Sequence, residues 1–110
     1  MGDEQIEKIQ AAVESARHIP ADKKAELLGL LSKLQPAIAK ASQTHQDHAK
    51  SVARLVEASA HEATRPEKKP ESIRKLVREL EQSVENFEAS HPELVALVTE
   101  YTAFLSAVGI

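Results

Sequence analysis

Histidines and one aspartate near the middle of the chain are the residues whose types and spacing could bind a metal ion. His45, Asp47 and His48 lie within four positions, and His61 follows on the same predicted helix. Side chains three residues apart share a helix face, so His45 and His48 could both bind one divalent cation. Metal sites in helical bundles, however, are built from side chains on facing helices. We therefore predict no metal and no cofactor, and keep a site at His45, His48 and His61 as the alternative.

Two further features resemble parts of catalytic sites. Glu88 and His91 have the Glu-x-x-His spacing of di-iron bundles, which need a second such motif and two more glutamates. The motif stands alone at a predicted helix corner, so we expect the His91 ring to bond the backbone there. Glu100 is the one charged residue between 94 and 110, and we expect it to face water. Without cysteine, or a strand-turn-helix elbow to expose a serine, the sequence predicts no enzyme.

Composition and charge argue against several other classes of function. The chain has 110 residues and a net charge of −3 with both signs interspersed, which is not typical of a protein that binds nucleic acid or anionic membranes. Its aromatic residues are Phe87, Tyr101 and Phe104 alone, too few for base-stacking platforms. The N-terminal residues lack the apolar segment of a signal peptide, and the apolar stretch 94–110 is shorter than a membrane span. We expect a cytoplasmic protein.

The elements that must position these residues are helices, because apolar residues recur every three or four positions along most of the chain. We predict a single all-α domain, a bundle of four or five helices without strands. Pro36 should kink or break the chain between the second and third helices. The helices are expected at about residues 3–17, 20–34, 37–64, 71–89 and 91–108, with a charged, proline-containing linker at 65–70.

The last helix is the most apolar, so we expect it to be the central helix of the bundle, surrounded by the others. Its start is marked by Ser90 in a capping box or, alternatively, by His91 as the cap before a proline. Gly109 is expected to end it in the left-handed conformation. The short connection from the preceding helix makes the two an antiparallel hairpin. The predicted core residues of the last helix are Leu97, Tyr101, Phe104 and Leu105.

Two surfaces could bind another protein. The second helix carries a dense leucine face, and a chain this short could leave part of it uncovered. On helix 71–89, basic residues occupy the first half and acidic residues the second half, which runs against the helix dipole. Two copies of that helix laid antiparallel would oppose unlike charges across a two-fold axis. The candidate interaction residues are Leu27, Leu30, Leu31, Arg74, Arg78, Glu81 and Glu85.

The end of the chain carries a family resemblance. It rests on Phe87-Glu88-Ala89-Ser90-His91-Pro92-Glu93-Leu94, followed by Leu105-Ser106-Ala107-Val108-Gly109-Ile110. These segments resemble a small bacterial family of unknown function, whose members end in F-E-x-x-H-P-x-L, a short apolar helix and L-S-x-x-G-I. The resemblance implies a small cytoplasmic helical protein with no assigned activity. The segment 37–66 departs from the shorter family pattern.

These patterns together favour a non-catalytic protein-interaction or self-assembly module. Its partner would be another protein or a second copy of the chain, with no nucleic acid and no membrane involved. The alternative is a metal-binding helical protein that uses His45 and His48.

Overall fold

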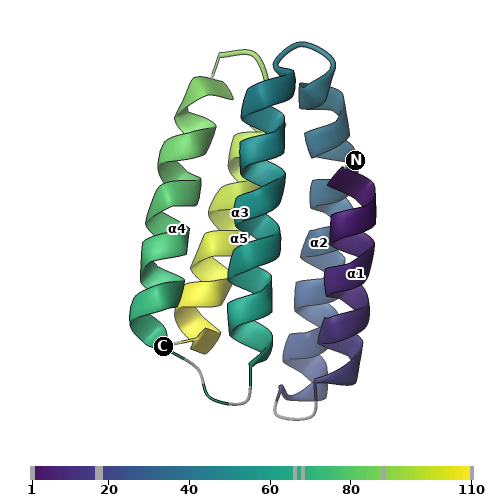
Figure 1. Ribbon diagram of the computed structural model, residues 1–110, viewed down its shortest axis with the longest axis vertical. Helices are drawn as coiled ribbons and strands as arrows, with labels where there is room; N and C mark the ends of the chain where they lie inside the picture. The colour runs from purple at the N-terminus through teal and green to yellow at the C-terminus, as the bar shows by residue number, and fades with distance from the viewer. Residues whose placement is uncertain (1, 17–18, 66, 68, 88, 110) are drawn as a thin grey trace.

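The computed structural model describes residues 2–16, 19–65, 67, 69–87 and 89–109, and this part of the chain is mostly helical (Figure 1). Its elements, in chain order, are α1 Gly2–Ser15, α2 Ala21–Ser42, α3 Gln46–Thr64, α4 Pro70–Val84, the 3-10 helix η1 Glu85–Phe87, and α5 Pro92–Gly109. The described residues contain no strand, and the prediction of an all-α bundle is confirmed. The molecule measures 38 × 24 × 19 Å along its principal axes.

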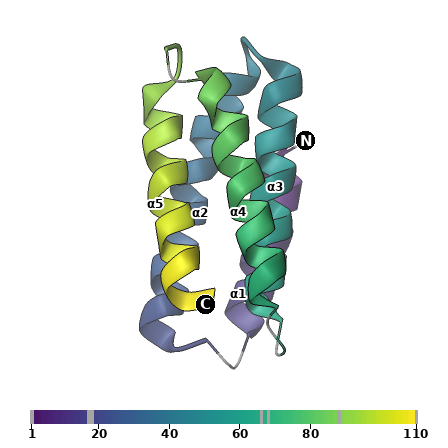
Figure 2. The same cartoon turned by 90° about the vertical axis from the view of Figure 1, so that its left-hand side faces the viewer.

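The helices α2, α3, α4 and α5 form an up-and-down bundle, in which α5 closes the ring against α2 (Figures 1 and 2). α1 lies outside this ring and packs across α2 and α3. α4 and α5 are antiparallel neighbours, which confirms the predicted C-terminal hairpin. Short connections between successive helices favour this antiparallel order.

The position of α5 differs from the prediction that it is the central helix of the bundle. α5 packs mainly against α2 and α4, so it forms one corner of the ring. Its outer side is exposed at Ala96, Thr99, Glu100 and Ala103, and Glu100 faces water as predicted. Short side chains cover most of this outer side, which is why the helix has an apolar composition although part of it is solvent-exposed.

The boundary between α2 and α3 lies later than predicted. α2 continues through Pro36 to Ser42 and α3 begins at Gln46, so the predicted end of the second helix before Pro36 is wrong. Pro36 lacks the N–H that would bond the carbonyl of Ser32. Both residues are exposed, so water can bond that carbonyl in place of the missing donor. Leu34 and Ile38 are buried on either side of the proline, and this packing stabilises the continuous helix.

The start of α5 follows the second of the two predicted capping arrangements. The carbonyl of His91 accepts hydrogen bonds from the N–H groups of Leu94 (3.1 Å) and Val95 (3.3 Å). His91 is therefore the cap residue in place of Ser90. Pro92 is the first residue of the helix, a position where its missing N–H has no intrahelical partner to lose.

Two helix ends near the C-terminus also differ from the prediction. α4 ends at Val84, and η1 then carries the buried ring of Phe87. α5 includes Gly109, and the described glycines all have negative φ, so the predicted left-handed ending at this residue is wrong. Ile110 lies outside the described residues.

The prediction of the core residues of α5 is confirmed for three of its four residues. Tyr101, Phe104 and Leu105 are buried, whereas Leu97 is half-buried.

Candidate functional site

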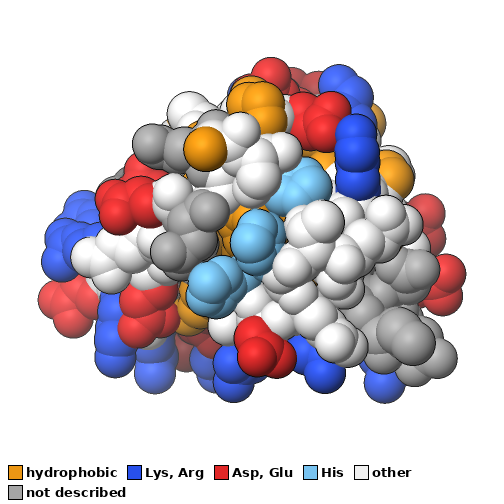
Figure 3. All heavy atoms as spheres, turned by 90° about the horizontal axis from the view of Figure 1, so that it is seen from above, with side chains coloured by type: hydrophobic (Ala, Val, Ile, Leu, Met, Phe, Trp, Pro, Cys, Tyr) orange, Lys and Arg blue, Asp and Glu red, His pale blue; other side chains and the backbone are white. Residues whose placement is uncertain are grey.

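One end of the bundle brings together three of the chain's five histidines, where the α2–α3 connection meets the η1–α5 connection. His45 precedes α3, His48 lies in its first turn, and His91 precedes α5. Their ring centroids lie 5.6, 6.0 and 5.8 Å from the centroid of Phe87. Figure 3 shows histidine side chains gathered on this end of the molecule. We call these four residues the histidine cap.

The histidine cap differs from the metal site considered from the sequence. The ring centroid of His45 is 6.1 Å from that of His48 and 6.3 Å from that of His91. His61 lies in the last turn of α3, so the structure does not bring it to His45 and His48. Within the part of the chain that the structure describes, no three His, Asp or Glu side chains are placed to hold a metal ion. The three imidazoles instead pack against the ring of Phe87.

His91 is the most buried histidine of the cap, with 8% of its surface exposed. Its Nε2 lies 2.9 Å from Oγ1 of Thr44, and the Thr44 hydroxyl donates to the carbonyl of Ala41 at 3.3 Å. The Thr44 hydroxyl has one hydrogen, so the tautomer of the His91 ring decides which of the two groups donates in the shorter bond. The His91 ring therefore bonds a side chain of the α2–α3 connection, and the predicted backbone partner is wrong.

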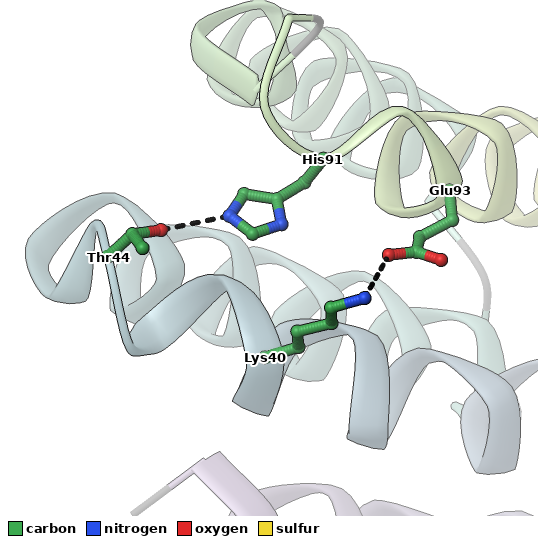
Figure 4. A network of polar contacts seen from close by, with 4 residues as sticks. All are labelled: Lys40, Thr44, His91 and Glu93. Carbon is green, nitrogen blue, oxygen red and sulfur yellow. Dashed lines mark hydrogen bonds and ion pairs between the residues drawn. The ribbon is translucent and has the colours of Figure 1, made fainter.

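A second polar contact joins the same two elements. Lys40 Nζ and Glu93 Oε1 form an ion pair at 3.1 Å beside the contact between Thr44 and His91 (Figure 4). The Lys40 and Glu93 side chains are 64% and 58% exposed, so this ion pair stabilises the fold by no more than ~1 kcal/mol. We call these four residues the α2–α5 clasp. The predicted helix 37–64 placed Thr44 far from any helix end, so sequence reasoning missed this contact.

Four charged residues form an exposed line along α4 and into the first residue of η1. Ile73, Val77, Leu80 and Val84 turn into the core, whereas Arg74, Arg78 and Glu81 of α4 and Glu85 of η1 are all exposed. These four follow each other at spacings of four, three and four residues, so they lie on one stripe. The ion pairs of the described residues join Lys40 to Glu93 and Glu62 to Arg65, and none involves this charged stripe.

The leucine face of α2 is part of the core and is not exposed. Leu27, Leu30 and Leu31 are all buried, so the idea that they form an open interaction surface is wrong. α1 packs on α2 from outside the ring, and α3 and α5 pack on it within the ring. Helical periodicity shows that a face is apolar, but it does not show whether the covering helix belongs to the same chain.

The chain's single tyrosine is the one described group with a strongly perturbed pKa. Tyr101 OH donates to the carbonyl of Val56 at 2.9 Å and lies 2.8 Å from Oγ of Ser59. Burial raises the pKa of the Tyr101 phenol well above its usual range, and the Ser59 hydrogen bond lowers it by a smaller amount. The phenol stays protonated at neutral pH and joins α5 to α3. Because all three residues are buried, this cluster is part of the core and has no access to a substrate.

No family model, curated protein or solved structure matches this chain. The described helices include none with the length and apolar character that a membrane crossing requires. The features from which a function can be argued are therefore the exposed surfaces of the chain itself, and chiefly the histidine cap and the charged stripe.

Proposed function

We propose that this protein is a non-catalytic interaction module, which binds a helix of another protein or of a second copy through the charged stripe of α4. The observation that carries the proposal is that Arg74, Arg78, Glu81 and Glu85 are exposed and make no ion pair within the described residues. Complementary charges on a partner would raise the rate of association and select one orientation.

The order of these charges supports the proposal independently. Acidic residues stabilise the first turn of a helix and basic residues its last turn. α4 has Glu71 in its first turn, Arg74 and Arg78 on either side of its midpoint, and Glu81 in its last turn, and Glu85 directly follows the helix. The dipole of α4 favours Glu71 but not Glu81 in the last turn, so it does not explain the acidic end of the stripe, whereas recognition by a partner would.

We also propose that the protein acts in the bacterial cytoplasm. The support is the resemblance of residues 87–94 and 105–110 to a small bacterial family, together with a chain that has no cysteine. Metal binding through His45 and His48 is the second candidate function. It is supported by their exposure and by the 6.1 Å between their ring centroids, but it has fewer ligands than metal sites normally use.

The interaction proposal is tested by affinity capture. The immobilised protein is incubated with a lysate of its source organism, to which an untagged copy of the protein has been added. We expect a bound protein that is retained by the parent and lost from the double variant Arg74→Gln with Arg78→Gln. The matched control is Lys50→Gln with Arg54→Gln, which removes the same charge from exposed positions on α3. Identical captured proteins for the parent and both double variants would refute the proposal.

A further inference from the structure

We infer that the partner of the charged stripe is a second copy of this chain, with the two α4 helices antiparallel across a two-fold axis. The inference rests on the proposed function and adds the identity of the partner. It starts from the positions of the four charges along α4 and at the start of η1. Arg74 and Glu85 lie equally far from the midpoint between Glu79 and Leu80, and so do Arg78 and Glu81.

This symmetry has a direct geometric meaning. When two identical helices pack antiparallel, the residues that face each other lie at equal distances on either side of the two-fold axis. An axis through that midpoint therefore sets Arg74 against Glu85 of the second copy and Arg78 against Glu81. The axis repeats each opposition, so every charge of the stripe on both copies meets an opposite charge.

Other partners satisfy the stripe less well. Two copies in parallel register would oppose Arg74 to Arg74 and Glu81 to Glu81, which is repulsive. A uniformly acidic partner would bind the arginine half and repel the glutamate half, and a uniformly basic partner would do the reverse. The stripe needs a partner that carries both signs, placed so that each charge meets its opposite. A second copy laid antiparallel provides this arrangement.

The four stripe residues are exposed, so a second helix can approach them. α3 and α5 both lie beside α4 in the bundle. α4 has 15 residues and is therefore roughly 22 Å long at ~1.5 Å per residue. Because the proposed contact uses one helix of each copy, we expect a small interface of the transient class. The dimer should therefore dissociate readily and weaken as salt screens the ion pairs.

Sedimentation equilibrium of the full chain tests the inference at protein concentrations of roughly 10–500 μM, where weak, transient complexes are populated. We expect a monomer–dimer equilibrium at low salt. An all-acidic stripe made by Arg74→Glu with Arg78→Glu, and an all-basic stripe made by Glu81→Arg with Glu85→Arg, should each weaken it at least tenfold. An equimolar mixture of these two double variants should form a heterodimer. The quadruple variant with all four changes should dimerise again, because each acidic residue of one copy then meets a basic residue of the other.

A control variant and a folding measurement accompany these samples. Lys50→Glu with Arg54→Glu alters the net charge by the same amount on exposed positions of α3, and it should leave the dimer unchanged apart from long-range repulsion. Circular dichroism should give the same helix content for all variants, because every substituted side chain is exposed.

A monomeric parent at low salt would overturn the inference, and so would two double variants that fail to combine. Lysate capture separates this result from failure of the proposed function. Capture of a different protein that depends on Arg74 and Arg78 would support the interaction module and refute self-association. If the chain neither dimerises nor captures a protein through these arginines, both proposals are refuted.

Discussion

Alkaline titration of Tyr101 is the most direct check on the buried hydrogen bonds of the core. In an unfolded chain a tyrosine ionises near pH 10, whereas burial raises the pKa of the Tyr101 phenol well above that value. The stabilisation by the neutral, buried phenol is complete below about pH 10, and it is lost as the pH rises. Because only the unfolded state releases this proton, the free energy of unfolding should fall by about 1.4 kcal/mol per pH unit above pH 10.

Two measurements on the same samples follow this effect. The chain has one tyrosine and no tryptophan, so the ultraviolet absorbance of tyrosinate reports on Tyr101 alone, and circular dichroism reports on the helices. We expect tyrosinate to form only as the helices unfold. Tyr101→Phe is the matched control for every other effect of alkaline pH, and its stability should decline less steeply between about pH 10 and 12. Tyrosinate that forms near pH 10 while the helices remain folded would refute the burial of the phenol.

Three further predictions concern stability and metal binding. Leu105→Ala should lower the free energy of unfolding in urea by about 2–5 kcal/mol because Leu105 is fully buried; an unchanged midpoint would contradict its place in the core. Gly29→Ala should raise it by about 0.5–1 kcal/mol, since Gly29 lies within α2 and an added Cβ would meet nothing within 4 Å, and a destabilised variant would show that the site is not open. Zinc or nickel should leave the melting temperature unchanged; a metal-induced rise that disappears in His45→Ala or His48→Ala would establish the metal site instead.

The sequence predicts the class of fold because apolar spacing reflects which side of each helix is buried. The spacing of Ile73, Val77, Leu80 and Val84 corresponds directly to their burial in α4. The effect of Pro36 on the helix is harder to predict from the sequence. Whether the helix continues through this residue depends on whether the carbonyl of Ser32 lies in water or in the core, which apolar spacing does not show. The prediction therefore ended the second helix too early.

That error also concealed the histidine cap and the α2–α5 clasp. With a helix predicted from residue 37 to 64, Thr44 and His45 lie inside an element, away from every connection. Once α2 ends at Ser42, both residues fall in the connection at the end of the bundle, next to His91. The exposed charges of the stripe could be identified from the sequence because they lie close together along the chain, whereas contacts between helices depend on where each helix ends.

The order in which the helices pack has a consequence for folding kinetics. α2, α3 and α4 each pack on the next helix along the chain, and the pairing of α2 with α5 closes the ring. Chains dominated by contacts between sequence neighbours fold rapidly, because little loop-closure entropy is lost before each contact forms. The α2–α5 seam spans the longest stretch of chain, so we expect it to form after the transition state. Substitutions at Thr44 or His91 should then accelerate unfolding and leave the refolding rate nearly unchanged.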